Sequence, residues 1–488
     1  MNTNLPVLIV IIPLMSSFIM PVVGLIRRRY CHILSFIATS AVFILAIMLI
    51  KNVTLHGTLS YHLGNWEPPW GIEYVIDNLG AYMAAIIAFI GLSISVYSKK
   101  SIEKELNKNL VFYYTLHMLL LTGLLGIVVT GDIFNLYVFL EISSLSAYAL
   151  IALGEKRQAL TASFKYLILG TIAASFILIG IGFLYAVTGT LNMADMSLHL
   201  EELYGSRVVH AAAVLIVVGL SIKIALFPLH SWLPNAYTHA PSTVSALIAA
   251  LMSKVGAYMM IRLLYDVFTI NFFIETMPVG EILSWTAAIA IIAGSISAIA
   301  QKNIKRMLAY SSISQIGYIV LGIGLANTAG LTGSLLHILN HALMKGCLFL
   351  AVGAIIYKTG IKNIGDFNGL GKKMPYTMAF FAIASLSMVG VPPLCGFFSK
   401  WYLALGSIEA GRWIFALVIL SSSLLNAGYF FRVLEKAYFG EQNKIDKTIA
   451  PASMLIPMLV LAAACIVFGI LVYMILPYVQ YTAISLIQ

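Results

Sequence analysis

Fourteen stretches of about 20 mostly apolar residues follow one another along the chain, separated by short polar connections. A helix of about 20 such residues is long enough to cross the hydrocarbon core of a bilayer. The composition agrees, because 60% of the residues are hydrophobic and only 10% are charged. We therefore predict an all-α polytopic membrane protein with about 14 transmembrane helices. The stretches are residues 4–26, 31–50, 74–97, 110–130, 132–152, 160–187, 208–228, 241–265, 281–300, 304–325, 330–357, 376–408, 411–433 and 451–476.

The distribution of basic residues supports this count and predicts an orientation. Of the 29 Lys and Arg residues, 20 lie in or at the edges of alternate connections, four lie in or at the edges of the remaining connections and five lie deep inside apolar stretches. Connections rich in basic residues usually stay in the cytoplasm. We therefore expect a multi-pass protein of a prokaryotic inner (plasma) membrane with both termini outside. The basic residues form no single patch, so the net charge of +10 does not indicate binding to nucleic acid.

Six ionisable side chains lie inside the predicted helices, together with two histidines. A charged residue at the centre of a bilayer costs about 3 kcal/mol even on lenient scales, so such residues usually face a protein interior or a water-filled cavity. Charges of both signs occur here beside imidazoles, which favours a proton relay. The residues are Glu141, Lys165, Lys223, Lys254, Lys345 and Lys400, with His337 and His341.

The depth of these residues separates two interpretations. Glu141, Lys254 and Lys345 are 10, 14 and 16 residues into their helices. This corresponds to roughly 15–24 Å in a core about 30 Å thick, too deep for the side chain to reach the interface. Lys165 is about five residues into its helix, so an accessory role and an ammonium at the interface are equally good interpretations. A purely structural ion pair with Glu141 is the alternative for Lys223.

Prolines predict that two of the helices are broken. Pro228 follows Lys223, and Pro392 and Pro393 precede Lys400. Proline removes a backbone donor and clashes with the preceding turn. Lysines beside breaks in two corresponding helices indicate paired sites in a protein built from inverted repeats. We expect N-terminal helices at 1–109, inverted five-helix repeats at 110–267 and 281–433, each with one broken helix, and an amphipathic segment with a last helix at 434–488.

The spacing of three residues favours a continuous row of titratable groups. His337, His341 and Lys345 are four residues apart, so they lie along one face of a helix. His230 and His239 follow the first break, where they either line a proton access route or cap helices.

Several motifs resemble one family of membrane proteins. Residues 131–142, 184–193 and 227–242 read GDIFNLYVFLEI, LYAVTGTLNM and FPLHSWLPNAYTHAPS. These motifs, with residues 164–170, 251–258 and 337–345, resemble the antiporter-like subunits of respiratory complex I and of Mrp cation/proton antiporters. The resemblance covers nearly the whole chain and is strongest to the D subunit of Mrp antiporters and to the equivalent subunit of membrane-bound hydrogenases.

The resemblance implies a proton relay near the membrane midplane. Its members would be Glu141 paired with Lys223, Lys254 as the link between the two halves, His337, His341 and Lys345 as the continuation, and Lys400 as the last member.

The resemblance also implies the function of the chain. It implies a proton-translocating subunit of a multisubunit Mrp-type Na⁺/H⁺ antiporter, with other membrane subunits as partners and H⁺ and Na⁺ as the ions. The alternative is a proton- or sodium-pumping subunit of a complex I-like or membrane-bound hydrogenase oxidoreductase. We expect a transport subunit that is no enzyme by itself and holds no cofactor and no metal. The chain has no dinucleotide or phosphate-loop motif, and its four cysteines are scattered.

Overall fold

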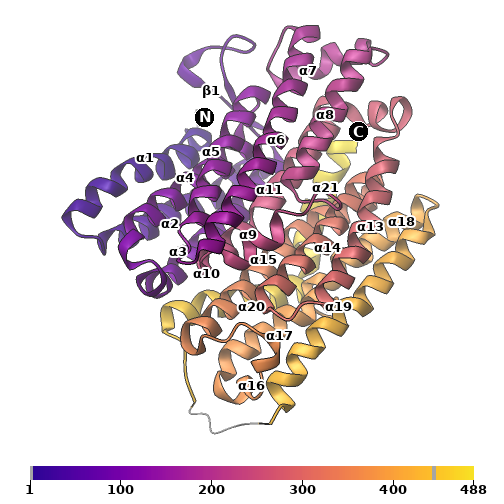
Figure 1. The fold of residues 1–488 in the computed structure, drawn as a ribbon. Helices are drawn as coiled ribbons and strands as arrows, with labels where there is room; N and C mark the ends of the chain where they lie inside the picture. Colours follow the sequence, from indigo (N-terminus) through magenta and orange to yellow (C-terminus); the bar gives the residue numbers. More distant parts are fainter. Residues whose placement is uncertain (1–3, 442–446, 488) are drawn as a thin grey trace. The chain divides into compact units, whose positions relative to one another are not determined.

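The computed structural model describes residues 4–441 and 447–487, which are almost entirely helical (Figure 1). Helices are expected here because, in a bilayer, intrahelical hydrogen bonds satisfy the backbone without help from water. Twelve helices among the described residues are long and apolar enough to cross a membrane. Two further crossings are interrupted, each near the predicted prolines. The predicted all-α membrane fold with about 14 crossings is therefore confirmed.

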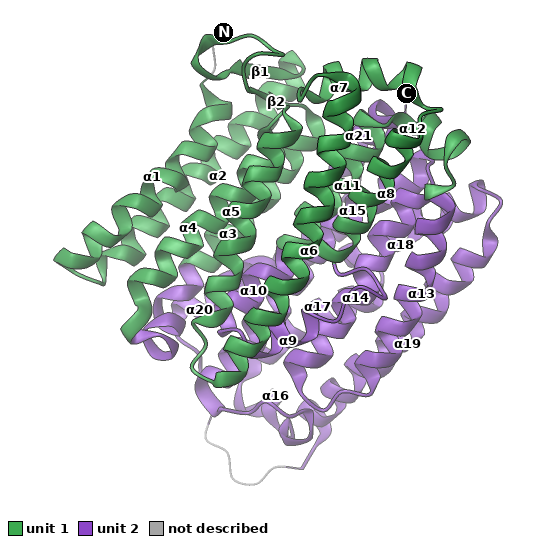
Figure 2. Ribbon diagram, turned by 45° about the horizontal axis from the view of Figure 1, so that its top comes forward, with its two compact units in different colours: residues 1–95, 108–224, 252–279 green, residues 96–107, 225–251, 280–488 purple. Residues whose placement is uncertain are grey.

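The contacts within the chain divide it into two compact units (Figure 2). Unit 1 contains Met1–Ser95, Lys108–Ile224 and Met252–Val279, and unit 2 contains the rest. Helix α3 (Asn78–Glu105) contributes residues to both units. The remaining helices of unit 1 are α1 (Leu5–Ile26), α2 (Tyr30–His56), α4 (Leu110–Val129), α5 (Ile133–Ala152), α6 (Arg157–Thr188), α7 (Met193–Leu200), α8 (Arg207–Lys223), α11 (Met252–Ile261), the π-helical turn η4 (Arg262–Val267) and α12 (Thr269–Asn271).

Unit 2 consists of Val96–Asn107, Ala225–Leu251 and Gly280–Gln488, and its second segment starts at the first helix break. Its helices are α9 (Leu233–His239), α10 (Ser242–Ala250), α13 (Val279–Ile299), α14 (Ile304–Gly324), α15 (Thr328–Thr359), α16 (Leu370–Lys373), α17 (Pro375–Val389), α18 (Cys395–Glu409), α19 (Trp413–Phe439), α20 (Ala452–Ile470) and α21 (Val472–Ile487). The unit boundary after Ile224 falls inside the interrupted crossing, so the units do not coincide with the predicted repeats. The repeat boundaries stay a prediction, because compactness and repeat symmetry are different properties.

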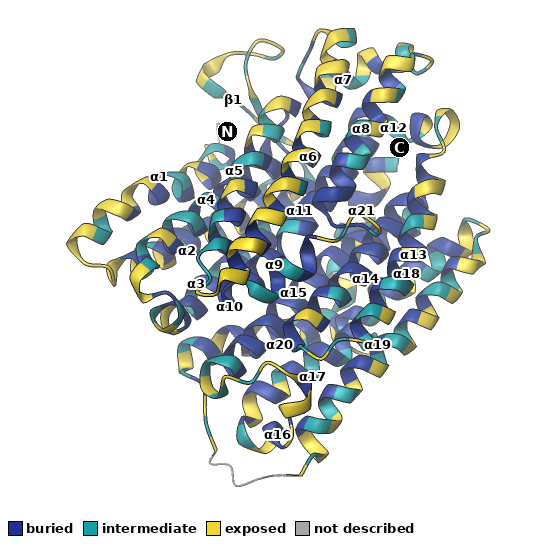
Figure 3. Ribbon diagram, viewed as in Figure 1, coloured by how far each residue is buried: buried dark blue, intermediate teal, exposed yellow. Residues whose placement is uncertain are grey.

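Close helix packing in unit 1 depends on small residues. Helix α6 packs along α8, α4 packs against α1 and α5, and α11 contacts α4 and α8. At Gly219 of α8, an added Cβ would lie 2.7 Å from the carbonyl oxygen of Ala173 on α6. Small residues at such positions let membrane helices approach closely enough for van der Waals packing. Exposed residues remain along α1 and α6, as Figure 3 shows, where lipid or another subunit can cover them.

One helix forms the centre of unit 2. Helix α15 packs against α10, α14, α17, α18, α20 and α21, and every residue of its most apolar 18-residue window is buried. A helix that is apolar on all sides and surrounded by other helices can keep polar side chains away from lipid. Helix α15 carries His337, His341 and Lys345, which therefore lie in the core of this unit.

Two local features differ from the predicted all-helical fold. Residues Leu59–His62 (β1) and Glu73–Ile76 (β2) pair as an antiparallel hairpin, with Leu59 opposite Ile76. The predicted amphipathic segment from residue 434 begins as the end of the long helix α19, and residues 442–446 of that segment lie outside the described residues.

Candidate functional site

The end of α8 brings an ammonium group beside a carboxylate in unit 1. Lys223 is the last residue of α8 and is 6% exposed. Its Nζ lies 3.4 Å from Oε1 of Glu141 and donates to Oγ of Ser144 at 2.8 Å. Glu141 and Ser144 are one turn apart on α5. The last carbonyl groups of a helix have no intrahelical partner, and a cation at that end is stabilised by the helix dipole.

Lys254 lies one element further along unit 1. It occupies the first turn of α11 and is fully buried, with its Nζ 3.4 Å from Oγ of Ser253. The predicted eighth crossing is divided into α10 and α11 at Leu251, where neither proline nor glycine predicts an interruption. Lys254 therefore follows a helix break. The sequence predicts such breaks only beside Lys223 and Lys400, where prolines occur.

A cluster of charged side chains lies directly after α11, at the start of η4. No pattern in the sequence predicts this cluster. Arg262 donates from Nη2 to Oδ1 of Asp77 at 2.7 Å, from Nη1 to Oδ2 of Asp77 at 2.8 Å, and from Nη1 to Asp266. We counted Arg262 with the connections that carry few basic residues, but its side chain is only 12% exposed. Burial by itself would raise the pKa of Asp77, but the charge and hydrogen bonds of Arg262 outweigh it and hold this pKa below its usual value.

The centre of unit 2 contains the row of titratable groups on α15. His337, His341 and Lys345 are fully buried, and the two imidazole rings stack with centroids 5.7 Å apart. Lys345 Nζ donates to the carbonyl oxygen of Leu308 at 2.8 Å and to Oγ of Ser311, both on α14. The four-residue spacing therefore places all three groups along one face of the helix, as the sequence indicates.

The second predicted break supplies hydrogen-bond acceptors for Lys400. Helix α17 ends at Val389 and α18 begins at Cys395, with Pro392 and Pro393 between them. The break leaves the carbonyl groups at the end of α17 without intrahelical partners. Lys400 Nζ donates to the carbonyl oxygens of Met388 and Val389, both at 2.9 Å, and to Oγ of Ser423 at 3.1 Å.

Aromatic and hydroxyl groups connect Lys400 with the α15 row. His337 Nδ1 lies 2.9 Å from Oγ of Ser399, the residue before Lys400. The ring of Tyr318 lies 5.1 Å from Lys400 Nζ and 5.4 Å from the His337 ring. The printed contacts therefore link His341, His337 and Ser399, and the Tyr318 ring joins His337 to Lys400. Lys345 lies one turn further along α15 than His341.

The accessory residues Lys165, His230 and His239 differ in exposure. Lys165 is exposed on α6, which favours the interpretation that its ammonium reaches the interface. His230 is half-buried in unit 2, where its ring stacks on Phe227 with centroids 5.0 Å apart. His239 is the half-buried last residue of α9. Both interpretations of the two histidines stay predictions.

Lys305 is a second buried cation that sequence reasoning missed. In the sequence it stands beside Lys302 and Arg306, so we counted it among the residues that set the topology, but the structure places it in the first turn of α14. Lys305 is only 6% exposed, and its Nζ donates to the carbonyl oxygen of Ala240 at 2.8 Å and to Oγ of Ser245 at 3.0 Å. Its ammonium therefore holds the turn between α9 and α10, next to His239.

These side chains are suited to carrying protons. Lysine, histidine, glutamate and hydroxyl groups exchange protons or donate and accept hydrogen bonds to a proton in transit. Over residues 4–441 and 447–487, no group of three or more His, Cys, Asp or Glu side chains is arranged to hold a metal ion.

The fold and the site define a multi-pass membrane protein with buried cationic side chains beside interrupted helices. Residues 130–426 match the family model described as NADH:quinone oxidoreductase/Mrp antiporter, TM. This match covers more than half of the chain. The protein therefore belongs to this family of transmembrane subunits.

Individual relatives match almost the full length. The chain is 47% identical to NADH-quinone oxidoreductase subunit N of Desulforudis audaxviator, with 96% of each chain covered. It is 32% identical to the D subunit of the Na⁺/H⁺ antiporter of Bacillus subtilis, with 99% of this chain and 97% of that protein covered. Among solved structures, a chain of the membrane-bound sulfane sulfur reductase, an archaeal respiratory membrane complex, matches with a TM-score of 0.93 at 32% identity. That match covers 100% of this chain and 98% of the other.

Proposed function

We propose that the protein is the proton-translocating membrane subunit of a multisubunit Mrp-type Na⁺/H⁺ antiporter. The observation that carries this proposal is the ion pair between Lys223 and Glu141, because it lies at the end of an interrupted helix where a small movement can form or open it. The similarity to the D subunit of an Na⁺/H⁺ antiporter supports it. The partners are other membrane subunits, the ions are H⁺ and Na⁺, and both termini lie outside the plasma membrane of a prokaryote.

The ion pair controls the proton on Lys223. Opposite charges about 4 Å apart attract each other by roughly 4 kcal/mol at an effective dielectric constant of about 20. This attraction keeps Lys223 protonated while Glu141 stays near. When Na⁺ or a movement of a neighbouring subunit draws Glu141 away, the attraction is lost and Lys223 releases its proton towards Lys254. Ser144 holds the nitrogen of Lys223 in position during the exchange.

The α15 row carries protons through unit 2. Lys345, His341 and His337 accept and release the proton in turn, and Ser399 and Lys400 receive it at the end of the row. The acceptors around Lys400 are neutral carbonyl and hydroxyl oxygens. They stabilise an ammonium less strongly than a carboxylate does, so Lys400 can both bind and release a proton. Transfer from Lys254 to this row rests on the family resemblance.

A second candidate function is a pump subunit of a complex I-like or membrane-bound hydrogenase-type oxidoreductase. The 47% identity to NADH-quinone oxidoreductase subunit N favours it. The same residues would then move protons or Na⁺, driven by electron transfer in other subunits. The chain itself would still be a transport subunit with no enzyme activity.

Inverted membrane vesicles from an antiporter-deficient host test the two candidates. The vesicles contain the complete gene cluster, and a fluorescent dye reports the proton gradient. We expect added Na⁺ to move protons across a pre-formed gradient without an electron donor. Proton movement that requires NADH or another electron donor would contradict the antiporter function and support the pump. A signal equal to that of vesicles without the gene cluster would contradict both.

A further inference from the structure

Three residues at four-residue intervals lead from the buried Lys254 to the surface of unit 1. Lys254, Tyr258 and Arg262 lie along one face of α11 and its continuation η4. Lys254 is 0% exposed and Tyr258 1%, whereas the side chain of Arg262 is 12% exposed. The carboxylates that bind Arg262, on Asp77 and Asp266, are 27% and 29% exposed. This column is a direct path between a proposed proton carrier and the surface.

The guanidinium of Arg262 is held at every nitrogen atom. Nε and Nη2 donate to the hydroxyl of Tyr258 at 3.2 and 3.1 Å, and the two Nη atoms donate to Asp77 and Asp266 as described above. The Tyr258 hydroxyl in turn donates to the carbonyl oxygen of Val128 at 3.1 Å. The hydrogen atom of this hydroxyl is thereby directed towards the backbone.

We infer that Arg262 is a proton barrier that closes this side of Lys254. A guanidinium keeps its proton under all physiological conditions, so it cannot pass a proton on. The two carboxylates hold the guanidinium in place, and their negative charges compensate the cost of burying its positive charge. The inference rests on the proposed function, since it takes Lys254 as a proton carrier.

Passive proton leak measures this barrier directly. The purified complex is reconstituted into liposomes with a pH-sensitive dye, and a potassium diffusion potential drives protons without Na⁺ or an electron donor. We expect Arg262→Gln to raise the proton leak several-fold. The exposed Arg207, at the start of α8, is the control, and Arg207→Gln should leave the leak unchanged. Equal leak in wild type and a folded Arg262→Gln complex would overturn the inference.

A double variant separates a barrier from a general loss of structure. Lys254→Ala combined with Arg262→Gln should return the leak to the wild-type level, because the carrier behind the barrier is gone. A leak that persists in the double variant would mean a damaged fold and would overturn the inference. If Arg262→Gln does not assemble, Arg262→Lys is used instead, because a lysine can release its proton. A raised leak is again the expected result, and a leak equal to that of the wild type would again overturn the inference. Because no Na⁺ is present, the result is independent of whether the vesicle test supports antiport.

A different observation concerns a pocket at the ends of two membrane-crossing helices of unit 2. The first turns of α13 and the turn between α18 and α19 enclose about 240 Å³. Its walls include Trp285, the buried Phe415 and the exposed Trp413. The rings of Trp285 and Phe415 are in edge-on contact, with centroids 5.1 Å apart. Tryptophan is enriched where helices leave the hydrocarbon core, which places this pocket at the level of lipid headgroups.

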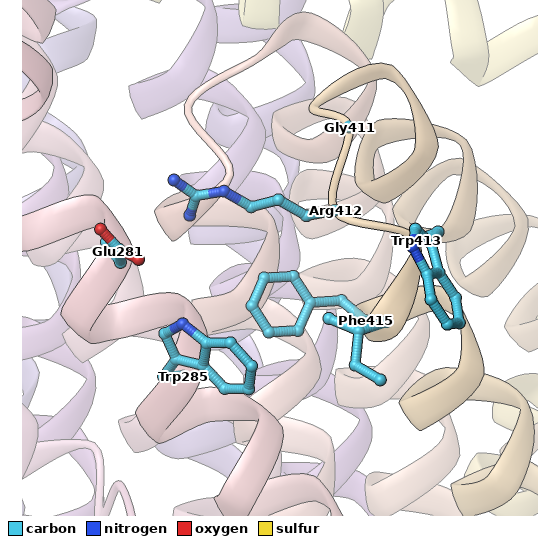
Figure 4. A pocket seen from close by; sticks show the side chains of 7 residues that line it. Glu281, Trp285, Gly411, Arg412, Trp413 and Phe415 are labelled. Carbon is cyan, nitrogen blue, oxygen red and sulfur yellow. The ribbon is translucent and has the colours of Figure 1, made fainter.

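Two opposite charges line the pocket without pairing. In Figure 4 the guanidinium of Arg412 extends across the pocket towards the side that carries Glu281. Among the described residues, neither group has an oppositely charged partner within 4.0 Å. A ligand that carries an anionic and a cationic group can therefore bind both charges at once.

We propose that the pocket binds the zwitterionic headgroup of a phosphatidylethanolamine-type lipid. Arg412 would bind the phosphate through paired N–H donors, and Glu281 would accept hydrogen bonds from the primary ammonium. The indole rings would cover the glycerol region. The volume is below the roughly 300–1,000 Å³ of sites for drug-sized molecules, which suits a headgroup whose acyl chains stay in the membrane.

Thermal unfolding of the purified complex in nanodiscs tests this proposal. Nanodiscs contain either phosphatidylethanolamine or anionic phosphatidylglycerol in a phosphatidylcholine background. We expect a higher melting temperature with phosphatidylethanolamine, loss of this preference in Glu281→Gln, and loss of stabilisation by both lipids in Arg412→Gln. Equal stabilisation by both lipids in the wild type would overturn the proposal. So would a preference that Glu281→Gln leaves intact, because Glu281 would then not recognise the ammonium of the headgroup.

Discussion

The Nζ of Lys223 and Oε1 of Glu141 are 3.4 Å apart, which is longer than the about 2.7–2.9 Å of a tight charge-assisted hydrogen bond. The hydroxyl of Ser144 lies nearer to the same nitrogen, at 2.8 Å. The ion pair joins a buried ammonium to a carboxylate that is 28% exposed, and the neutral hydroxyl is the closer partner of that ammonium. An ion pair in this state needs only a small movement to open, which suits a switch better than a structural contact.

Ser144→Ala tests the contribution of this hydroxyl. The variant removes one hydrogen bond from a buried charged group, worth roughly 1.5–3 kcal/mol. We expect Na⁺-driven proton transport to fall about tenfold or more while the complex still assembles. The rate of dye response in inverted vesicles is the measurement. Ser146→Ala on the same helix is the control, since its hydroxyl donates to the carbonyl of Ile142 within α5. Equal rates in the two variants would contradict the role of Ser144.

Ser399→Ala tests the connection between the α15 row and Lys400. The variant removes the hydroxyl that lies 2.9 Å from His337 Nδ1. We expect slower proton transport with unchanged thermal stability to within about 1 kcal/mol, the usual net value of one hydrogen bond. Ser407→Ala on the same helix, where the hydroxyl donates to Leu403 within α18, should transport at the wild-type rate. Transport that is unchanged in Ser399→Ala would exclude this hydroxyl from the relay.

Lys305→Met tests the buried cation that the sequence analysis missed. The variant keeps the length of the side chain but loses the hydrogen bonds to Ala240 and Ser245. We expect a several-fold loss of transport, because the turn between α9 and α10 is no longer held. Lys302→Met, at an exposed position of the same connection, should behave as wild type. A topological role alone predicts that the two variants are alike.

Gly219→Ala tests the packing of α6 on α8. The new Cβ would meet the backbone carbonyl oxygen of Ala173 at 2.7 Å, so the helices must separate. We expect a loss of about 1–3 kcal/mol in stability, as for other overpacked sites. Gly182→Ala is the control, since no atom lies within 4 Å of its Cβ position. Melting temperatures of the purified complex in detergent should fall for the first variant only, and equal values would contradict the packing account.

The sequence predicts the membrane crossings and the broken helices well because the physical causes are local. Twenty apolar residues must form a helix in lipid, and Pro228, Pro392 and Pro393 lack a backbone donor and clash with the preceding turn at the two interrupted crossings. The four-residue spacing of His337, His341 and Lys345 is also a local property. It predicts a shared face before any tertiary contact is known.

The features that the sequence did not predict depend on tertiary contacts. The sequence analysis counts Lys305 and Arg262 with the polar connections, where a positive charge usually indicates orientation in the membrane. Both are buried by residues distant in sequence: Lys305 by Ala240 and Ser245, and Arg262 by Asp77. The interruption of the helix at Leu251 also has no proline or glycine as a signal. Such burial follows from the packing of elements and not from local composition.

The central claim is that Lys223 carries a proton, and its substitution tests this claim most directly. Inverted vesicles that contain the whole gene cluster with Lys223→Ala are compared with vesicles that contain the exposed-site control Lys165→Ala, at equal amounts of assembled complex. The account predicts that Na⁺-dependent proton movement disappears in Lys223→Ala and persists in Lys165→Ala. Wild-type proton movement in Lys223→Ala would contradict the account and make the buried ion pair a purely structural contact.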